Sequence, residues 1–429
     1  MKLGILTFHS QLNYGGVLQC WALKTALEGM GHEVVVVDRW HYPDNRLLRR
    51  EFATFSAKGW VKLLIRGLLG CGDFGKLLRT IRTIRFVRGL ELTKEHFCVW
   101  EELSPSRKLQ KPFQSARPRH IPRRRCPKGS LDGVPRPSNM SVSQLDLLVV
   151  GSDQVWHCGD WGDPQPYFLE GAPKVWAISY AASFGMTAIP EGQVELYKRG
   201  LGRFAAISCS EKEGVEICRG LGYAATHVVD PTLLLEPNEW GSLLGADETS
   251  PPHGDAASIR RLVCYFMSVD LAAALPLLEK FADKMNCTVE VLTNNQYMLQ
   301  PIPKSIAALV RNFGDGRVKI CRGYGPKEFV KAFAGATWTL TDSFHAVMFS
   351  SIFKCNARFL VPQEGWRKTM FARIEEFAKT CIRGRFFVDD VAQALSSFER
   401  GETVTYDADR IAAMRAESMK WLENALISV

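Results

Sequence analysis

The stretch Asp146–His157 constrains the fold of this chain more than any other segment. Its four apolar residues, Leu147–Val150, form a run that is too short for a helix and is bounded by Gly151. Such a run is typical of a strand buried on both faces of a parallel sheet. Polar and aromatic side chains follow at once, in the order Ser-Asp-Gln-Val-Trp-His. Because ligands of open α/β sheets bind just beyond the carboxyl ends of the strands, this segment predicts a site for a polyhydroxyl substrate.

Composition limits the class of protein. The chain has 429 residues, of which 46% are hydrophobic, and this is enough for two domains with separate cores. No apolar run reaches the length of a membrane span, and residues 1–8 resemble a strand rather than a signal peptide, so we expect a cytoplasmic protein. Twelve cysteines occur without a Cys-x-x-Cys pair, which favours buried free thiols over a metal site or a disulfide framework.

Strand and helix patterns alternate along the chain, which predicts an α/β fold of two doubly wound domains facing a central cleft. We expect an N-terminal Rossmann-like domain over 1–245, a C-terminal one over 260–405 and, within 406–429, a helix at Asp407–Leu426 that packs back on the first domain. The Gly-, Pro- and Ser-rich segment 245–259 is the expected boundary.

The first domain is expected to open with a strand at Leu3–Phe8, a glycine-bearing loop at Gln11–Gly16 and a helix over Val17–Met30. Further strands are expected at Glu33–Asp38, Val175–Ala182, Ala205–Ser208, Arg261–Met267, Thr288–Leu292, Val318–Cys321, Thr337–Thr341 and Ala357–Val361, and a strand with a turn is expected within His227–Leu233. Further helices are expected at Glu211–Leu221, Leu271–Met285 and Ser305–Phe313.

Two basic segments together carry more positive charge than the net charge of the whole chain, which is +9. Segment 46–100 alternates large apolar residues with Arg and Lys, as a basic amphipathic helix or helix pair does. It fits either a surface helix or one that docks on an anionic membrane. Segment 103–140, rich in Pro, Arg and Ser, is expected to be a flexible insertion. The chain has no nucleic-acid-binding motif, so we expect no nucleic-acid partner.

A second polar cluster, Asp342–His345, follows the apolar stretch Ala334–Leu340 and opens a helix. Asp342 or Ser343 can cap this helix, whose N-terminus offers free N–H groups to an anion. The helix dipole disfavours the cationic form of His345, and a neutral imidazole near a phosphate site can carry protons. A capping turn with a core histidine is the alternative interpretation.

Four segments together resemble the polysaccharide pyruvyl transferase family: Asn13–Gln19, Gly151–Trp156, Asp230–Leu234 and Asp342–His345. They occur in the family's order and lie in both halves of the chain. The resemblance implies a GT-B-like fold of two Rossmann-type domains. It also implies transfer of a pyruvyl group from phosphoenolpyruvate to hydroxyls of a lipid-linked or polymeric glycan, forming a ketal and releasing phosphate. One acid and one base suffice for this reaction, so we expect no cofactor and no metal.

The resemblance also assigns residues. His345 matches the family's catalytic histidine and would protonate the donor carbon or the leaving phosphate, with the donor bound mainly by the C-terminal domain. Asp153 is either a base or orienter for the acceptor hydroxyl or a structural residue that binds loop amides. Some members have an Arg where this chain has Ser343, so other cations must hold the donor. Arg322, Lys327, Arg367 and Lys368 are the candidates. The remaining candidates for substrate binding are Asn13, Tyr14, Gly15, Gly16, Ser152, Gln154 and Trp156, the last as a surface on which the sugar ring stacks.

Two other classes of protein remain open. A nucleotide-sugar-dependent glycosyltransferase with the same GT-B architecture also uses a cleft between Rossmann-like domains, and fold alone does not separate the two. A non-enzymatic basic protein that binds membranes or nucleic acid would explain the cations in 46–140 but not the two polar clusters outside that region. If the chain is a transferase acting on lipid-linked glycans, a cationic segment would hold it at the inner face of the membrane.

Overall fold

The computed structural model describes residues 1–9, 13–38, 97–99, 142–158, 164–169, 175–244, 260–293, 316–321, 324–362 and 366–429. The helix expected at Ser305–Phe313, the segments 103–140 and 245–259 and, apart from Phe97–Val99, the basic segment 46–100 lie outside the described residues. The expected domain limits therefore stay a prediction. In the described part of the chain, no helix combines the length and apolarity needed to cross a membrane.

The N-terminal half builds a five-stranded sheet in which all pairs are parallel. Its spatial order is β3-β2-β1-β4-β5, the order of a Rossmann-type sheet. The strands are β1 (Lys2–Leu6), β2 (Glu33–Asp38), β3 (Phe97–Val99), β4 (Leu147–Val150) and β5 (Trp176–Ser179), and the accompanying helices are α1 (Tyr14–Gly29), α5 (Val194–Leu201) and α6 (Lys212–Gly220). All four residues of β4 are buried, as the sequence predicts for a central strand.

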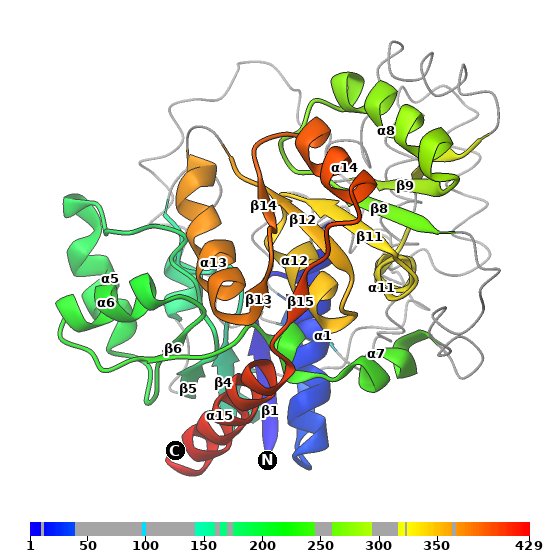
Figure 1. Cartoon of the computed structure of the whole chain (residues 1–429). Coiled ribbons are helices and arrows are strands. Elements are labelled where there is room, and N and C mark those ends of the chain that lie inside the picture. Colours follow the sequence, from blue (N-terminus) through cyan, green and yellow to red (C-terminus); the bar gives the residue numbers. More distant parts are fainter. Residues whose placement is uncertain are drawn as a thin grey trace, which may run out of the picture.

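The C-terminal half repeats this arrangement with six parallel strands in the order β10-β9-β8-β11-β12-β14. Helices α8 and α14 cover one face of this sheet (Figure 1) and share a core with it. The strands are β8 (Arg261–Tyr265), β9 (Thr288–Leu292), β10 (Val318–Cys321), β11 (Trp338–Thr341), β12 (Asn356–Leu360) and β14 (Phe387–Val388), and the helices are α8 (Leu271–Met285), α11 (Pro326–Ala334), α12 (Phe344–Ile352), α13 (Trp366–Cys381) and α14 (Val391–Glu399). The predicted fold class, GT-B-like with two Rossmann-type domains, is confirmed.

Two short sheets and several short helices complete the described chain. The small sheets pair β6 (Ser208–Cys209) with β7 (Thr226–His227) and β13 (Ile382–Arg383) with β15 (Thr405–Tyr406). Within His227–Leu233, where a strand with a turn is expected, the strand β7 ends at His227 and the turn is a 3-10 helix, η8 (Pro231–Leu234), capped by Asp230. The other short helices are η5 (Val142–Gln144), η6 (Gln165–Phe168), η7 (Glu191–Gln193) and α7 (Pro237–Leu244).

The first helix begins earlier than the sequence predicts. Tyr14, Gly15 and Gly16 form the first turn of α1 instead of a loop, and Asn13 is the N-cap, whose Oδ1 accepts a hydrogen bond of 3.0 Å from the Gly15 amide. Glycine is a poor helix former, which is why the sequence pattern alone indicates a loop here. The cap and the packing of α1 outweigh that propensity.

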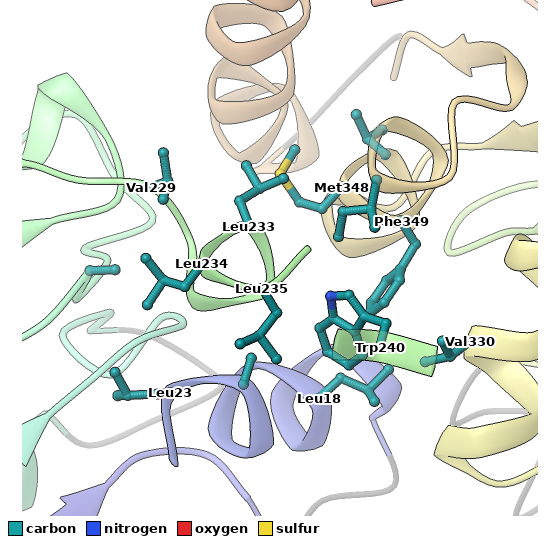
Figure 2. Packing of buried hydrophobic residues seen from close by; sticks show 14 of the residues in the cluster. Leu18, Leu23, Val229, Leu233, Leu234, Leu235, Trp240, Val330, Met348 and Phe349 are labelled. Atoms are coloured by element: carbon teal, nitrogen blue, oxygen red, sulfur yellow. The ribbon is translucent and has the colours of Figure 1, made fainter. Parts of the chain in front are cut away.

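A hydrophobic core joins the two domains. It includes residues of α1, η8, α7 and α12 together with the inner faces of both sheets. Figure 2 shows Leu18 of α1, Leu235 after η8 and Phe349 of α12 converging around Trp240. The Trp240 and Phe349 rings lie 4.8 Å apart at 71°, an edge-to-face contact. Because burying one large apolar side chain contributes roughly 1.5–3 kcal/mol, this core holds the two sheets in one arrangement.

The C-terminal helix packs back on the N-terminal domain, as expected. α15 (Ala408–Ile427) begins at the N-cap Asp407, and its Ser418 Oγ accepts a hydrogen bond of 3.0 Å from the Val229 amide. Arg415 Nε donates to the Leu233 carbonyl at 2.7 Å. Figure 1 shows this helix at the C-terminus of the chain, and the elements it contacts include η8 and α13. The end of the chain thus fixes the segment that leads into η8.

Candidate active site

Both predicted polar clusters lie at the switch points of the two sheets, where the strand order reverses. In the first sheet this point lies between β1 and β4, and Gly151–Trp156 follows β4. In the second it lies between β8 and β11, and Asp342–His345 follows β11. Ligands of open α/β sheets bind in the crevice that opens at such points. The structure brings the two crevices together, because the first turn of α1 packs against His345.

His345 is the residue at the centre of this junction. It is the second residue of α12 and is buried, with 10% of its side chain exposed. Its imidazole ring packs on Gly15 so closely that a Cβ at Gly15 would overlap Nδ1, Cγ and Cε1. Its Nε2 lies 3.7 Å from Asp230 Oδ2 and has no hydrogen-bond partner among the described residues. A buried ring nitrogen without a partner is a group that a ligand can satisfy.

Asp230 is the functional candidate that sequence reasoning missed. It is buried at the start of η8, where its Oδ1 accepts hydrogen bonds from the Thr232 amide at 2.9 Å and the Thr232 hydroxyl at 2.7 Å. These bonds fix the carboxylate, and Oδ2 faces His345. The sequence did contain a signal for this role. An Asp that caps a helix through one carboxylate oxygen keeps its second oxygen available for another group. The segment Asp230–Leu234 supported the family resemblance, but no role was assigned to its first residue.

Asp153 follows β4 and lies beside the N-terminus of α1. Its φ of 67° is in the left-handed region, which Asp adopts more readily than most residues. Oδ1 accepts a hydrogen bond of 2.9 Å from the Gln154 amide, and a Cβ at Gly16 would lie 3.5 Å from Oδ2. A carboxylate is stabilised next to a helix N-terminus. Asp153 can therefore act as a structural residue that accepts hydrogen bonds from loop amides, or as a base or orienter for the acceptor hydroxyl. The structure is compatible with both interpretations.

Ser152 is a structural residue and not an exposed substrate ligand. It is fully buried, and its Oγ donates to Gln19 Oε1. Gln19 Nε2 in turn donates to Thr7 Oγ1 at 3.0 Å and to the Gly16 carbonyl at 2.7 Å. The expected contact of Ser152 with substrate is therefore corrected to a structural role. The network joins the end of β4 to α1 and thereby positions Gly15 and Gly16 in the first turn of that helix.

The expectation that Trp156 stacks on a sugar ring is wrong for this structure. Its relative exposure is 0%, and its ring lies 5.6 Å from that of Phe168 and 5.1 Å from that of Phe184. A ring that is covered on all sides cannot contact a ligand without repacking this core. Gln154, half-buried beside Gly185, has an Nε2 with no hydrogen-bond partner in the described chain and stays a candidate for substrate binding.

Tyr14 also changes its role, because it joins the two domains. It is fully buried, its ring stacks on that of Phe329 at 4.4 Å, and its hydroxyl donates to the Tyr324 carbonyl at 3.1 Å. Burial raises the pKa of Tyr14 far above its usual value, so the hydroxyl stays protonated and remains a donor. The expected substrate contact is therefore corrected to a contact between α1 and the C-terminal domain.

The Tyr14→Phe variant tests this contact. It leaves the Tyr324 carbonyl without its bond from the hydroxyl, and we expect the free energy of unfolding to fall by about 1 kcal/mol. Thermal or urea unfolding measures the change. Tyr223→Phe is the control, because its hydroxyl donates to the Lys198 carbonyl at 2.8 Å in an exposed setting where water can replace the bond. Equal effects of the two variants would contradict the assignment.

The remaining candidates are placed as follows. Ser343 is the N-cap residue of α12, but its side chain makes no capping bond. Its amide donates to Thr341 Oγ1 at 3.0 Å. The Asp342 carboxylate is occupied by the amides of Met267 at 2.6 Å and Ser268 at 2.8 Å, so it holds the loop after β8 and does not cap α12. Arg322 and the side chains of Arg367 and Lys368 lie outside what the structure describes.

Two Rossmann-type domains that meet at their switch points, with a buried His–Asp pair at the junction, define a GT-B-like protein with one candidate site between its domains. Residues 13–363 match the sequence model of the polysaccharide pyruvyl transferase family. The chain therefore belongs to that family, whose members are transferases of polysaccharide pyruvylation.

The comparison with curated proteins gives no match. Among solved structures, the UDP-GlcNAc 2-epimerase from Neisseria meningitidis bound to UDP-GlcNAc aligns with a TM-score of 0.49 and 8% identity, covering 100% of this chain and 100% of that chain. The UDP-N-acetylglucosamine 2-epimerase from Rickettsia bellii aligns with a TM-score of 0.47 and 10% identity, covering 100% of this chain and 96% of that chain.

Proposed function

We propose that this protein transfers the pyruvyl group of phosphoenolpyruvate to two hydroxyls of a polysaccharide sugar and releases phosphate. The observation that carries the proposal is the buried His345, whose Nε2 faces a fixed carboxylate and has no hydrogen-bond partner in the described chain. Membership of the pyruvyl transferase family supports the same reaction. The donor is expected to lie on the side of the C-terminal domain and the acceptor on the side of Asp153.

The reaction needs one proton donor at the methylene carbon of the donor. Protonation at that carbon gives an oxocarbenium-like centre at the neighbouring carbon, and a sugar hydroxyl attacks this centre with loss of its own proton. A second hydroxyl then displaces phosphate and closes the ketal, and the leaving phosphate takes up the proton of that hydroxyl. In this proposal His345 supplies the first proton, and Asp153 orients or deprotonates the acceptor hydroxyl. General acid or base catalysis by one such group contributes about 10²–10⁴-fold.

Asp230 is the positioning residue in this proposal. Its fixed carboxylate places a negative charge 3.7 Å from Nε2, on the side of the imidazole that faces away from the packed Gly15, as a carboxylate stands beside a catalytic histidine. The junction therefore places a buried carboxylate and an imidazole side by side at the N-terminus of α12.

The Asp230→Asn variant tests that role. The amide keeps a cap oxygen for Thr232 but removes the negative charge, and we expect kcat to fall about 10- to 100-fold with little change in KM for the acceptor. The rate profile against pH is the readout that a merely structural role would not move. Asp270→Asn is the control, because Asp270 caps α8 in an exposed setting. Unchanged kcat and an unchanged profile in Asp230→Asn would contradict the positioning role.

The reaction itself is tested by incubating the protein with phosphoenolpyruvate and a panel of glycan acceptors. Phosphate release together with the mass of a pyruvylidene ketal on the acceptor is the expected result. Release of a nucleotide from UDP-sugars, with none of the ketal product, would instead identify a glycosyltransferase and overturn the proposal. The acceptor that reacts identifies the sugar.

A further inference from the structure

A cavity of about 120 Å³ lies beside the candidate site. Its wall comes from the segment 227–233, from α12 and α13, and from α15, and includes Asp230, Phe344 and Arg373. A space of this size holds several water molecules or a small organic anion. Asp230 belongs to both places, because it lines the cavity and its Oδ2 also faces His345 Nε2. A ligand in the cavity would thus lie next to the His–Asp pair.

Arg373 is the unusual residue in this wall. It is 7% exposed, and its Nε is buried with no hydrogen-bond partner in the described chain. Its guanidinium carbon lies 4.5 Å from the centre of the Phe344 ring, and Phe344 directly precedes His345. The aromatic face offsets part of the loss of water, but a buried cation normally also has a hydrogen-bonded counter-charge. Among the described residues Arg373 has none.

The carboxylates around the cavity are already engaged or exposed. Glu376 pairs with Lys212 at 2.8 Å. Asp230 uses Oδ1 for the two hydrogen bonds from Thr232. Glu417 and Arg410, on α15, are exposed residues of the same wall. No described carboxylate of this wall forms an ion pair with Arg373. Its planar guanidinium suits a carboxylate or a phosphate group of a ligand, which it can bind through two parallel N–H donors.

We propose that Arg373 binds an anionic group of the donor, its carboxylate or its phosphate, within this cavity. The inference rests on the proposed function for the identity of the donor. In this proposal Arg373 is the cation on α13 that places the donor beside Asp230 and His345. Arg373 is one to two turns further along α13 than Arg367, which the sequence indicated, and its surroundings in the fold are what distinguish it.

The test uses the full chain and measures binding apart from turnover. Arg373→Met replaces the guanidinium over Phe344 by an apolar side chain of similar length, and Arg219→Met removes an exposed arginine of α6 as the matched control. Isothermal titration calorimetry with phosphoenolpyruvate is expected to give a Kd about 10- to 100-fold higher for Arg373→Met and an unchanged Kd for Arg219→Met. Titration with inorganic phosphate and with pyruvate separates the two groups, because only the probe that binds Arg373 loses affinity.

Melting temperatures without ligand distinguish a binding role from a structural one. Removal of an unpaired buried charge is expected to leave the melting temperature of Arg373→Met equal to or above that of the wild type. If Arg373→Met does not fold, Arg373→Lys carries the test. It keeps the charge but loses the planar fork, and its Kd for phosphoenolpyruvate is expected to rise about tenfold. An unchanged Kd in the folded Arg373 variant overturns the proposal.

The failure of this inference differs from that of the proposed function. Wild-type protein that binds phosphoenolpyruvate through Arg373 but forms no ketal would support the site and refute the reaction. Ketal formation with an unchanged KM for the donor in Arg373→Met would refute the site and support the reaction. Binding and turnover are therefore measured on the same preparations.

Discussion

His345→Ala is expected to lower kcat for phosphoenolpyruvate turnover by about 10²–10⁴-fold, the contribution of one positioned acid. The reason is that Nε2 is the buried ring nitrogen that faces Asp230 and lacks a partner in the described chain. Donor turnover is measured by phosphate release under saturating acceptor. The fold is expected to survive, because the substitution removes an imidazole at the junction and leaves the apolar residues of α12 in place.

His32→Gln is the control for this experiment. His32 follows the C-terminal end of α1, where its Nδ1 contacts the N-terminal amine at 3.3 Å, whereas His345 packs on Gly15 at the N-terminal end of that helix. Its activity should equal that of the wild type. Wild-type kcat in a folded His345→Ala protein would remove His345 from the mechanism, although the fold and the family assignment would stand. A His345→Gln variant with partial activity would indicate a role in hydrogen bonding without proton transfer.

Gly15→Ala should produce the second large effect. Its Cβ would overlap the His345 ring, so either the imidazole turns away from Asp230 or α1 separates from α12. Overpacking of this kind costs about 1–3 kcal/mol of stability. A displacement of about 1 Å in a catalytic group lowers the rate on the order of 10²-fold. We therefore expect kcat to fall by about that factor, measured together with the melting temperature.

The same helix supplies a matched control. Gly29 ends α1, and a Cβ there would have no atom within 4 Å. Gly29→Ala is expected to be neutral or to stabilise the protein by up to about 1 kcal/mol, since alanine is the better helix former. Gly15→Ala and Gly29→Ala thus make the same chemical change at two ends of one helix. Equal activity and stability in the two variants would show that the imidazole does not depend on the space at Gly15.

Much of the fold follows from local sequence. The strands at Glu33–Asp38, Leu147–Val150, Thr288–Leu292 and Val318–Cys321 have the predicted bounds, as does α8. A short apolar run between turn residues identifies a buried strand without knowledge of its neighbours. The predicted start of α1 was wrong. Its two glycines disfavour a helix locally, and only the Asn13 cap and the surrounding core favour one.

The candidate site was predictable only in part. His345 and Asp153 were identified because both follow strand ends, and position after a strand is a local property of the sequence. Trp156 follows the same strand end as Asp153, yet it is buried among Phe168 and Phe184. Whether a side chain near a strand end faces ligand or core depends on segments distant in the chain. The sequence pattern therefore indicates a neighbourhood but not the direction of each side chain.

The sequence by itself determined that two polar clusters stand at the ends of buried parallel strands, because apolar runs and turn residues encode that locally. Only the tertiary structure decided that the two clusters meet. The shared core around Trp240 sets Gly15 of the first domain against His345 of the second and brings Asp230 to the same imidazole. These contacts join residues far apart in the chain, and they arise from the packing of whole helices, which no single segment specifies.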